Sequence, residues 1–190
     1  MEKIDVVIVG ASAAGLMCAI EAGKRGRSVV VLDQAKKPGN KIRMAGGGKC
    51  NFTNLDVVPA NFISGNRHFV KSALSRYTQW DFIAMVQSYQ IPYHERDHGQ
   101  LFCDRSAKDI LDMLLNECQL AGVGIRLQCP VSRYEKKADH HFVIDTPRGS
   151  LHCQSLVIAS GGLSIPTMGA SPFGYKVAEA FGIAVKPTSA

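Results

Sequence analysis

The sequence lacks a C-x-x-C pair, although it contains six cysteines. No histidine stands at a metal-ligand spacing from them, so neither a zinc site nor a dithiol redox motif is predicted. We expect reduced, mostly buried thiols and no bound metal. The chain also lacks internal repeats and has only one tryptophan in 190 residues.

An apolar stretch long enough to span a bilayer is missing as well. The chain runs from Met1 almost directly into a short apolar run, without a charged n-region, an h-region or a small-residue cleavage site. These features predict a cytoplasmic protein without membrane contact.

Charge of one sign is in excess, since the formal net charge is +6 and the pI is about 9.1. The lysines and arginines are scattered, and the densest groupings are dipeptides such as Lys36-Lys37. Aromatic and basic residues are not interleaved in the way that is typical of a stacking platform for single-stranded nucleic acid. We therefore assign the charge to an anionic cofactor and disfavour nucleic acid as a partner. Hydrophobic residues at 46% are typical of a globular protein.

The first 33 residues predict a strand, a helix and a second strand. Residues 4–9 form a Val- and Ile-rich run interrupted only by Asp5, which is typical of a strand buried on both faces. Apolar residues recur at helical spacing over residues 13–22, and residues 28–33 form a second Val-rich strand. This pattern is a βαβ unit with a right-handed crossover.

The rest of the chain extends this unit into a larger α/β domain. Residues 34–62 lack periodicity and predict a long functional or disordered loop. Helices are expected at residues 67–77, 78–89, 106–120 and 174–181, and strands within 91–102 and at 124–129, 131–136, 141–146, 150–153 and 156–159. The predicted fold class is α/β, Rossmann-like, with a mostly parallel sheet and an antiparallel β-meander as one crossover.

A dinucleotide fingerprint lies between the first predicted strand and helix. Gly10 and Gly15 provide its first and last glycines, while Ser12 replaces the middle one. We expect the backbone there, with Ala13 and Ala14, to hold a pyrophosphate at the helix N-terminus.

Asp33 ends the second predicted strand 18 residues after Gly15. Near this offset a carboxylate accepts hydrogen bonds from the adenosine ribose hydroxyls, which disfavours NADP. The alternative is that the glycines serve only tight strand–helix packing and Asp33 is a solvated charge.

A second glycine-rich motif follows, consisting of Gly46, Gly47, Gly48, Lys49, Cys50 and Asn51. Consecutive glycines allow N–H groups to converge on an anion or a flavin edge, whereas the alternative is a flexible hinge. We interpret Cys50 as a structural thiol because no partner cysteine stands nearby.

A third motif, Ser160-Gly161-Gly162, ends the strand predicted to return beside the first. The side chains of Lys41 and Arg43 are expected either to contact a phosphate or to lie on a solvated face of the loop. The histidines, including the pair His140-His141, are expected at the surface.

Together these motifs resemble a bacterial flavoprotein family, the YhiN-like family, which includes aminoacetone oxidase and a dehydro-bile-acid reductase. The stretch Gly-Gly-Gly-Lys-Cys-Asn-Phe-Thr-Asn carries most of the resemblance, with the fingerprint, Asp33 and residues 159–169. It implies an oxidoreductase that exchanges hydride between FAD and a small-molecule substrate, with NAD(P)H as a candidate second redox partner.

The resemblance also implies positions along the cofactor. Gly10, Ser12 and Gly15 lie at the pyrophosphate and Asp33 at the ribose. Val131 faces the adenine, and residues 46–51 lie beside the ribityl chain and isoalloxazine. Residues 160–162 pass near the cofactor, with Ser160 in place of the family's threonine, and Gln34 and Lys41 complete the expected set. No catalytic residue is assigned.

Members of this family continue well beyond 190 residues. Residues 1–190 are therefore expected to be the N-terminal part of an FAD/NAD(P)-binding domain, ending near an inserted substrate domain that is absent. Whether the chain alone is an enzyme stays open. The alternatives are a truncated, non-catalytic nucleotide-binding remnant, or a fragment that complements a C-terminal chain or forms a homo-oligomer. An NAD-dependent dehydrogenase is disfavoured, because holding NAD does not require the long glycine-rich loop.

Overall fold

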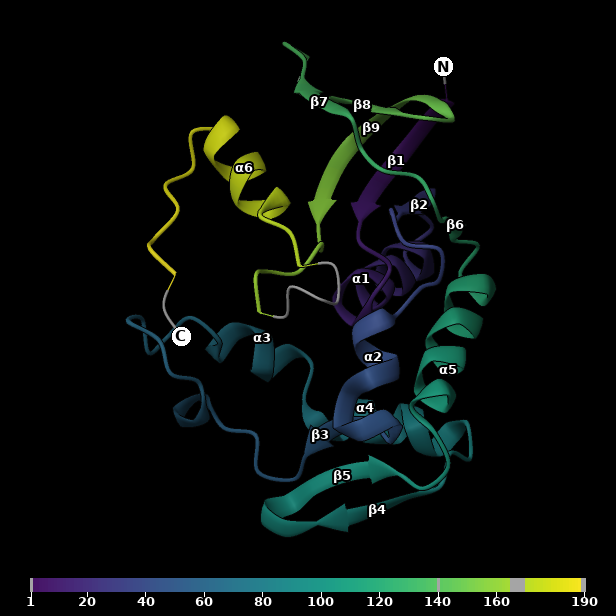
Figure 1. Cartoon of the computed structure of the whole chain (residues 1–190), viewed down its shortest axis with the longest axis vertical. Coiled ribbons are helices and arrows are strands. Elements are labelled where there is room, and N and C mark those ends of the chain that lie inside the picture. Colours follow the sequence, from purple (N-terminus) through teal and green to yellow (C-terminus); the bar gives the residue numbers. More distant parts are fainter. Residues whose placement is uncertain (1, 140, 165–169, 189–190) are drawn as a thin grey trace. The chain divides into compact units, whose positions relative to one another are not determined.

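The computed structural model describes residues 2–139, 141–164 and 170–188 (Figure 1). The chain divides into two compact units, Met1–Lys41 with Leu114–Ala190 and Ile42–Met113. The boundary falls within helix α5 (Ala107–Leu120). Each unit is described by itself.

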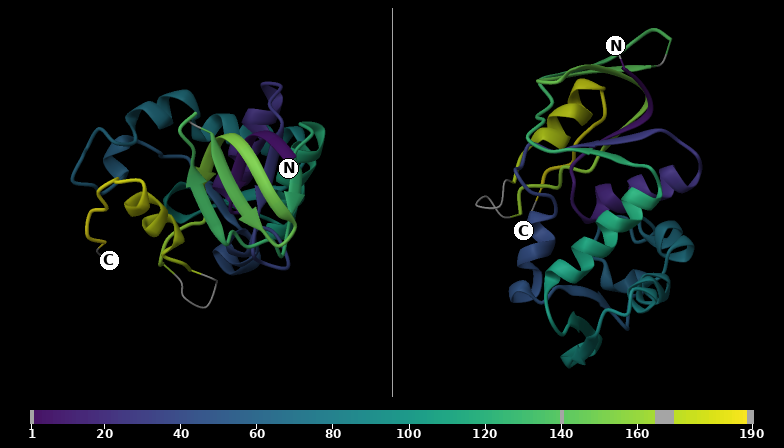
Figure 2. Two further views of the ribbon diagram at one scale, coloured as in Figure 1. Left: turned by 90° about the horizontal axis from the view of Figure 1, so that it is seen from above. Right: turned by 90° about the vertical axis from the view of Figure 1, so that its right-hand side faces the viewer.

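The first unit is built on a six-stranded sheet of order β6-β2-β1-β9-β8-β7 (Figures 1 and 2). Its strands are β1 (Glu2–Val9), β2 (Val29–Leu32), β6 (Gly124–Arg126), β7 (Arg133–Lys136), β8 (Phe142–Thr146) and β9 (Gly149–Ile158). The neighbours β6, β2, β1 and β9 pair in parallel, and β8 and β7 add an antiparallel edge. The predicted α/β fold with a mostly parallel sheet and a meander is confirmed.

The centre of the sheet is apolar on both faces, as predicted. Val7 and Ile8 of β1 are fully buried, and all four residues of β2 are buried. Asp5 is tolerated within β1 because its carboxylate accepts hydrogen bonds from the backbone N–H of Ser28 (2.8 Å) and from its hydroxyl (2.9 Å). These bonds, the backbone one first, lower the pKa of Asp5.

Strand β9 differs from the prediction of two short strands at residues 150–153 and 156–159. One continuous strand pairs with β1 in parallel from Leu151 to Ile158, while its first half also pairs with β8, as in Ile144↔Leu151. Gln154 and Ser155, which lie between the two predicted strands, are polar and exposed. They do not end the strand because β1 supplies hydrogen-bond partners along this stretch.

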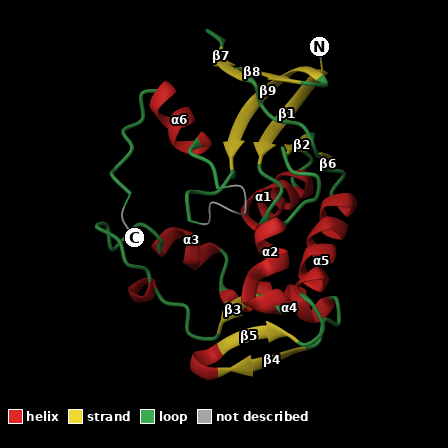
Figure 3. Cartoon of the chain, in the orientation of Figure 1, coloured by secondary structure: helices red, strands yellow, loops and turns green. Residues whose placement is uncertain are grey.

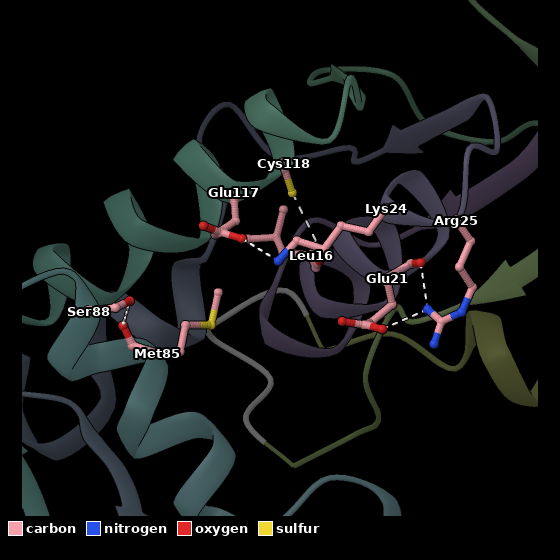
Figure 4. Close-up of polar contacts among 8 residues, drawn as sticks. All are labelled: Leu16, Glu21, Lys24, Arg25, Met85, Ser88, Glu117 and Cys118. Atoms are coloured by element: carbon pink, nitrogen blue, oxygen red, sulfur yellow. Dashed lines mark hydrogen bonds and ion pairs between the residues drawn. The ribbon is translucent and has the colours of Figure 1, made fainter.

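Helix α1 (Ala13–Lys24) packs closely against the C-terminal half of α5. A Cβ at Gly23 would lie 2.5 Å from the carbonyl oxygen of Ala121, so only glycine fits this approach. Figure 4 shows the Lys24–Glu117 ion pair (2.6 Å) and the Cys118 thiol donating to the Leu16 carbonyl (3.7 Å). The remaining helix of this unit is α6 (Phe173–Ala180).

The second unit contains a three-stranded antiparallel sheet of order β3-β5-β4 (Figure 3). Its strands are β3 (Asn51–Asn54), β4 (Tyr93–Arg96) and β5 (Gln100–Cys103), and its α-helices are α3 (Lys71–Arg76), α4 (Gln79–Ser88) and the first half of α5. Helix α2 (Asn40–Met44) crosses into this unit, followed by the 3-10 turns η1 (Ala45–Gly48), η2 (Pro59–Asn61) and η3 (Asp97–Gly99).

Two predictions fail in the second unit. The expected irregular loop at residues 34–62 contains the short elements α2, η1, β3 and η2. The helix expected at residues 67–77 is shorter than predicted, since α3 covers only Lys71–Arg76. Elements of three to six residues are too short to display a hydrophobic period. The predicted N-cap of α5 is confirmed, since the Ser106 hydroxyl accepts from the Lys108 N–H (3.1 Å).

In the part of the chain that the structure describes, no helix is both long and apolar enough to cross a membrane.

Candidate functional site

The fingerprint turn requires glycine at both of its ends. Gly10 has φ +117°, and a Cβ there would lie 2.3 Å from the carbonyl oxygen of Ala159. A Cβ at Gly15 would lie 1.8 Å from the carbonyl oxygen of Gly10. The backbone after β9 therefore approaches the turn, and the turn approaches α1, more closely than any side chain allows.

The turn presents the N-terminus of α1 without a side-chain cap. Ser12 has extended backbone angles and its hydroxyl makes no capping bond, and the first intrahelical bond runs from Leu16 N to Ser12 O (2.9 Å). The N–H groups of Ala13, Ala14 and Gly15 thus have no acceptor within the helix. Ala13 and Ala14 are exposed, so this positive helix end is open to an anion.

Asp33 fixes the geometry of the turn. One carboxylate oxygen accepts from the Ala11 N–H (2.7 Å) and the other from the Ala35 N–H (2.8 Å). Asp33 is half-buried, and each oxygen retains a second lone pair that a ribose hydroxyl can use. Gln34, beside it, is exposed.

The third motif joins this site at the end of β9. The Ala159 N–H donates to the Val9 carbonyl (2.8 Å), which places Ser160 beside the fingerprint turn. The Ser160 hydroxyl oxygen is buried and has no hydrogen-bond partner among the described residues. Since buried polar groups are normally paired, this hydroxyl fits a site that receives a polar ligand.

Lys41 also reaches this site. Its ammonium donates to the Ser164 hydroxyl (3.2 Å) and lies 3.3 Å from the position that a Cβ on Gly161 would take. Residues 10–15, 33–41 and 159–164 therefore converge beyond the carboxyl ends of β1, β2 and β9. This is where open α/β sheets bind their ligands.

Val131 is half-buried and packs against the core cluster that contains Val7, Leu32 and Ile144. Sequence reasoning missed Gly39, whose N–H donates to the Ala11 carbonyl (2.8 Å). It also missed two residues near the third motif. A Cβ on Gly162 would lie 3.0 Å from the Tyr175 hydroxyl, and one on Gly174 would lie 3.5 Å from the Ser160 hydroxyl. Neither contact has a sequence signal, because each is made between segments that are separate along the chain.

The second glycine-rich motif belongs to the second unit, where it forms a defined turn. Gly46, Gly47 and Gly48 have φ of 55°, 66° and 87°, and Cys50 also has a positive φ of 52°. A Cβ on Gly46 would lie 2.5 Å from the Phe102 ring.

Lys49 anchors this turn. Its ammonium donates to the carbonyls of Asp104 (2.7 Å) and Arg105 (3.1 Å). Asn51, which opens β3, is exposed. The binding of these residues to a flavin stays a prediction.

Cys50 has the environment of a structural thiol. It is 5% exposed, and burial raises its pKa to about 11. Burial, together with the neighbouring Cys50, raises the pKa of Cys103 to about 12. Both thiols are therefore protonated near neutral pH, which does not favour a redox role. Among the residues that the structure describes, no group of three or more His, Cys, Asp or Glu side chains could hold a metal ion.

These features define a class of protein. A parallel sheet, a glycine turn leading to an open helix N-terminus, and a carboxylate at the end of the second strand constitute a Rossmann-type dinucleotide-binding domain.

Solved structures share this fold. The chain is similar to L-proline dehydrogenase from P. horikoshii, with a TM-score of 0.62 and 12% identity, over 97% of this chain and 57% of that one. It is also similar to a flavocytochrome c3 fumarate reductase, with a TM-score of 0.61 and 19% identity, over 94% of this chain and 40% of that one. At these identities the likeness establishes the fold alone.

Residues 4–190 match the family described as "HI0933-like protein Rossmann domain". The chain is 53% identical over 190 residues to a protein of Escherichia coli K12 named "Ribosomal RNA dihydrouridine synthase", covering 100% of this chain and 47% of that protein. It is 51% identical over 187 residues to the protein of that name in Haemophilus influenzae, covering 97% of this chain and 47% of that protein. The chain belongs to the HI0933-like family, the FAD-dependent YhiN family that its motifs predicted. It spans about half the length of these curated relatives.

Proposed function

We propose that this chain is the N-terminal, FAD-binding part of a flavoenzyme that reduces uridine to dihydrouridine in ribosomal RNA. The observation that carries the proposal is the 53% identity along the whole chain with the E. coli relative of that name. The site at the ends of β1, β2 and β9 supports the flavin part independently.

The described residues fit FAD. The N–H groups of Ala13, Ala14 and Gly15 would hold the pyrophosphate, Asp33 the adenosine ribose, and the unpartnered Ser160 hydroxyl a polar group of the cofactor. FAD supplies hydride transfer at its N5 atom. Dihydrouridine differs from uridine by one hydride and one proton added across the C5–C6 bond, so turnover requires a reductant that returns two electrons. NAD(P)H is the candidate for that reductant.

This proposal changes the expected substrate. The sequence favoured a small organic molecule and disfavoured nucleic acid, because the cations are scattered. The relatives' name favours ribosomal RNA, and a net charge of +6 suits a polyanionic substrate as well as an anionic cofactor.

The first test is the visible absorption of the purified chain after incubation with FAD and desalting. We expect a retained flavin band, and we expect Asp33→Asn to weaken retention, because it places an amide NH₂ against one of two backbone N–H donors. Asp97→Asn, in the exposed turn η3, is the matched control and should retain flavin. A folded, colourless chain would contradict FAD binding and favour the non-catalytic remnant.

The second test concerns the reaction. The chain would be co-expressed with the part of the E. coli relative that it does not match, in cells deleted for that enzyme. Mass spectrometry of ribosomal RNA should then detect dihydrouridine. If the two-chain enzyme retains FAD but forms no dihydrouridine, the substrate assignment is wrong while the flavin assignment stands.

A further inference from the structure

Exposed apolar side chains concentrate in one segment of the second unit. Six of the ten exposed large hydrophobic residues in the described part of the chain lie between residues 58 and 80. They are Val58 (42% exposed), Phe62 (43%), Ile63 (104%), Phe69 (76%), Tyr77 (40%) and Trp80 (57%). All the aromatic residues in that exposed set are among them. We call residues 58–80 the aromatic segment.

The aromatic segment has no core of its own. None of residues 51–82 is buried, and the next buried residue is Ile83 of α4. Local polar bonds set its course, such as the Asn61 amide to the Asp56 carbonyl (2.8 Å) and the Gln79 amide to the Leu55 carbonyl (3.0 Å). A concentration of exposed aromatic surface on a segment without buried residues indicates a binding partner.

The charge of the segment indicates what that partner is. Residues 57–80 contain Arg67, Lys71 and Arg76 and no aspartate or glutamate. In the described part of the chain, none of the three cations forms an ion pair. A second copy of the chain docked by the same surface would oppose cation to cation, whereas a polyanion neutralises all three.

We propose that the aromatic segment binds single-stranded RNA. Unpaired bases stack on side chains such as Phe69 and Trp80, and Arg67 and Lys71 contact the phosphates between them. The inference rests on the proposed function, since it supplies the surface that grips the ribosomal RNA. It also revises the expectation that aromatic and basic residues are not interleaved in this chain.

Trp80 provides a direct assay because it is the only tryptophan. Its fluorescence would be titrated with a single-stranded RNA of about 20 nucleotides of mixed sequence, and with the same sequence as a duplex. We expect quenching by the single strand. Phe69→Ala should weaken binding roughly 5- to 100-fold, because it removes the ring on which one base stacks.

Arg67→Gln with Lys71→Gln should reduce the slope of log affinity against log salt by about 0.7 for each phosphate that the variant no longer neutralises. Lys3→Gln with Lys186→Gln removes the same charge at two exposed positions outside the segment. This control should leave the affinity nearly unchanged, and circular dichroism would confirm that every variant is folded.

The proposal is overturned if the single strand leaves Trp80 emission unchanged, or if both double variants weaken binding equally. It is also overturned if emission depends on protein concentration and not on RNA, which would identify a second copy as the partner. Flavin retention, read in the same samples at visible wavelengths, is independent. A colourless chain whose Trp80 is quenched by RNA would contradict the FAD assignment alone.

Discussion

At the scale of single residues, Gly10 shows how much the dinucleotide site depends on the absence of a side chain. Gly10→Ala should destabilise the protein by about 3 kcal/mol, because its Cβ would overlap the Ala159 carbonyl at 2.3 Å in addition to the strain of φ +117°. Urea unfolding measures this loss, and flavin retention should fall with it.

Gly26→Ala is the matched control. Gly26 also has a positive φ, +74°, but no atom lies within 4 Å of its Cβ position. Its replacement should cost only about 1 kcal/mol, for the backbone strain. Equal losses in the two variants would mean that close approach at Gly10 is not what the turn requires.

The cysteines give a prediction about pH. Burial raises the pKa of the Cys50 thiol from 9.0 to about 11, so the folded chain keeps a proton that the unfolded chain releases. The free energy of unfolding should therefore be unaffected by this group below pH 9 and should fall between pH 9 and about 11. Urea unfolding across this range tests it.

Cys50→Ala separates this effect from the titration of other groups, since it should reduce the fall in stability above pH 9. Rapid alkylation of Cys50 by iodoacetamide in the native chain at neutral pH would contradict a buried, protonated thiol.

At the scale of elements, helix α4 carries Trp80 in its first turn and begins with a capping box. The Thr78 hydroxyl accepts from the Asp81 N–H, and the Asp81 carboxylate accepts from the Thr78 N–H (2.7 Å). The bond from the Thr78 N–H, and then the Thr78 hydroxyl, which donates to the same carboxylate oxygen (2.7 Å), lower the pKa of Asp81. Thr78→Ala should lower the free energy of unfolding by about 1 kcal/mol. Urea unfolding measures this loss, with Trp80 emission as the local probe.

Thr78→Ser keeps the hydroxyl and should retain most of that stability. The carboxylate's contribution is present above its unfolded pKa of 3.8 and is lost as the pH falls below it. If alanine and serine behave alike, the cap does not stabilise α4.

At the scale of the whole molecule, FAD binding should appear as thermal stabilisation. Free FAD at 100 times its dissociation constant adds about 2.7 kcal/mol, which in a chain of this size raises Tm by roughly 5–10 °C. FMN is the matched ligand, because it lacks the adenosine and the second phosphate that we propose Asp33 and the α1 N-terminus to bind.

FMN at the same concentration should raise Tm much less. Equal stabilisation by FMN and FAD would mean that the fingerprint does not recognise the adenosine half. The number of thermal transitions is informative as well, because the chain has two compact units. Units that unfold independently would give two transitions, whereas a single Tm would mean that they unfold together.

The fingerprint half of the site could be predicted from the sequence because it is contiguous. Strand, glycine turn, helix and second strand follow one another within 33 residues, and Asp33 then meets Ala11 across one short crossover. The fold class followed from the same unit, since a parallel βαβ pattern leaves few topologies.

Only the tertiary structure decided which distant segments meet. Pairing with β1 made β9 one strand where the sequence predicted two, and that pairing brought Ser160 and Gly161 to the fingerprint turn, where Lys41 lies beside Gly161. The exposure of Phe69 and Trp80 was equally hidden, because a sequence shows which side chains are apolar but not whether another element covers them. Local pattern determined the elements and the dinucleotide turn, and long-range contacts determined burial, exposure and the remainder of the site.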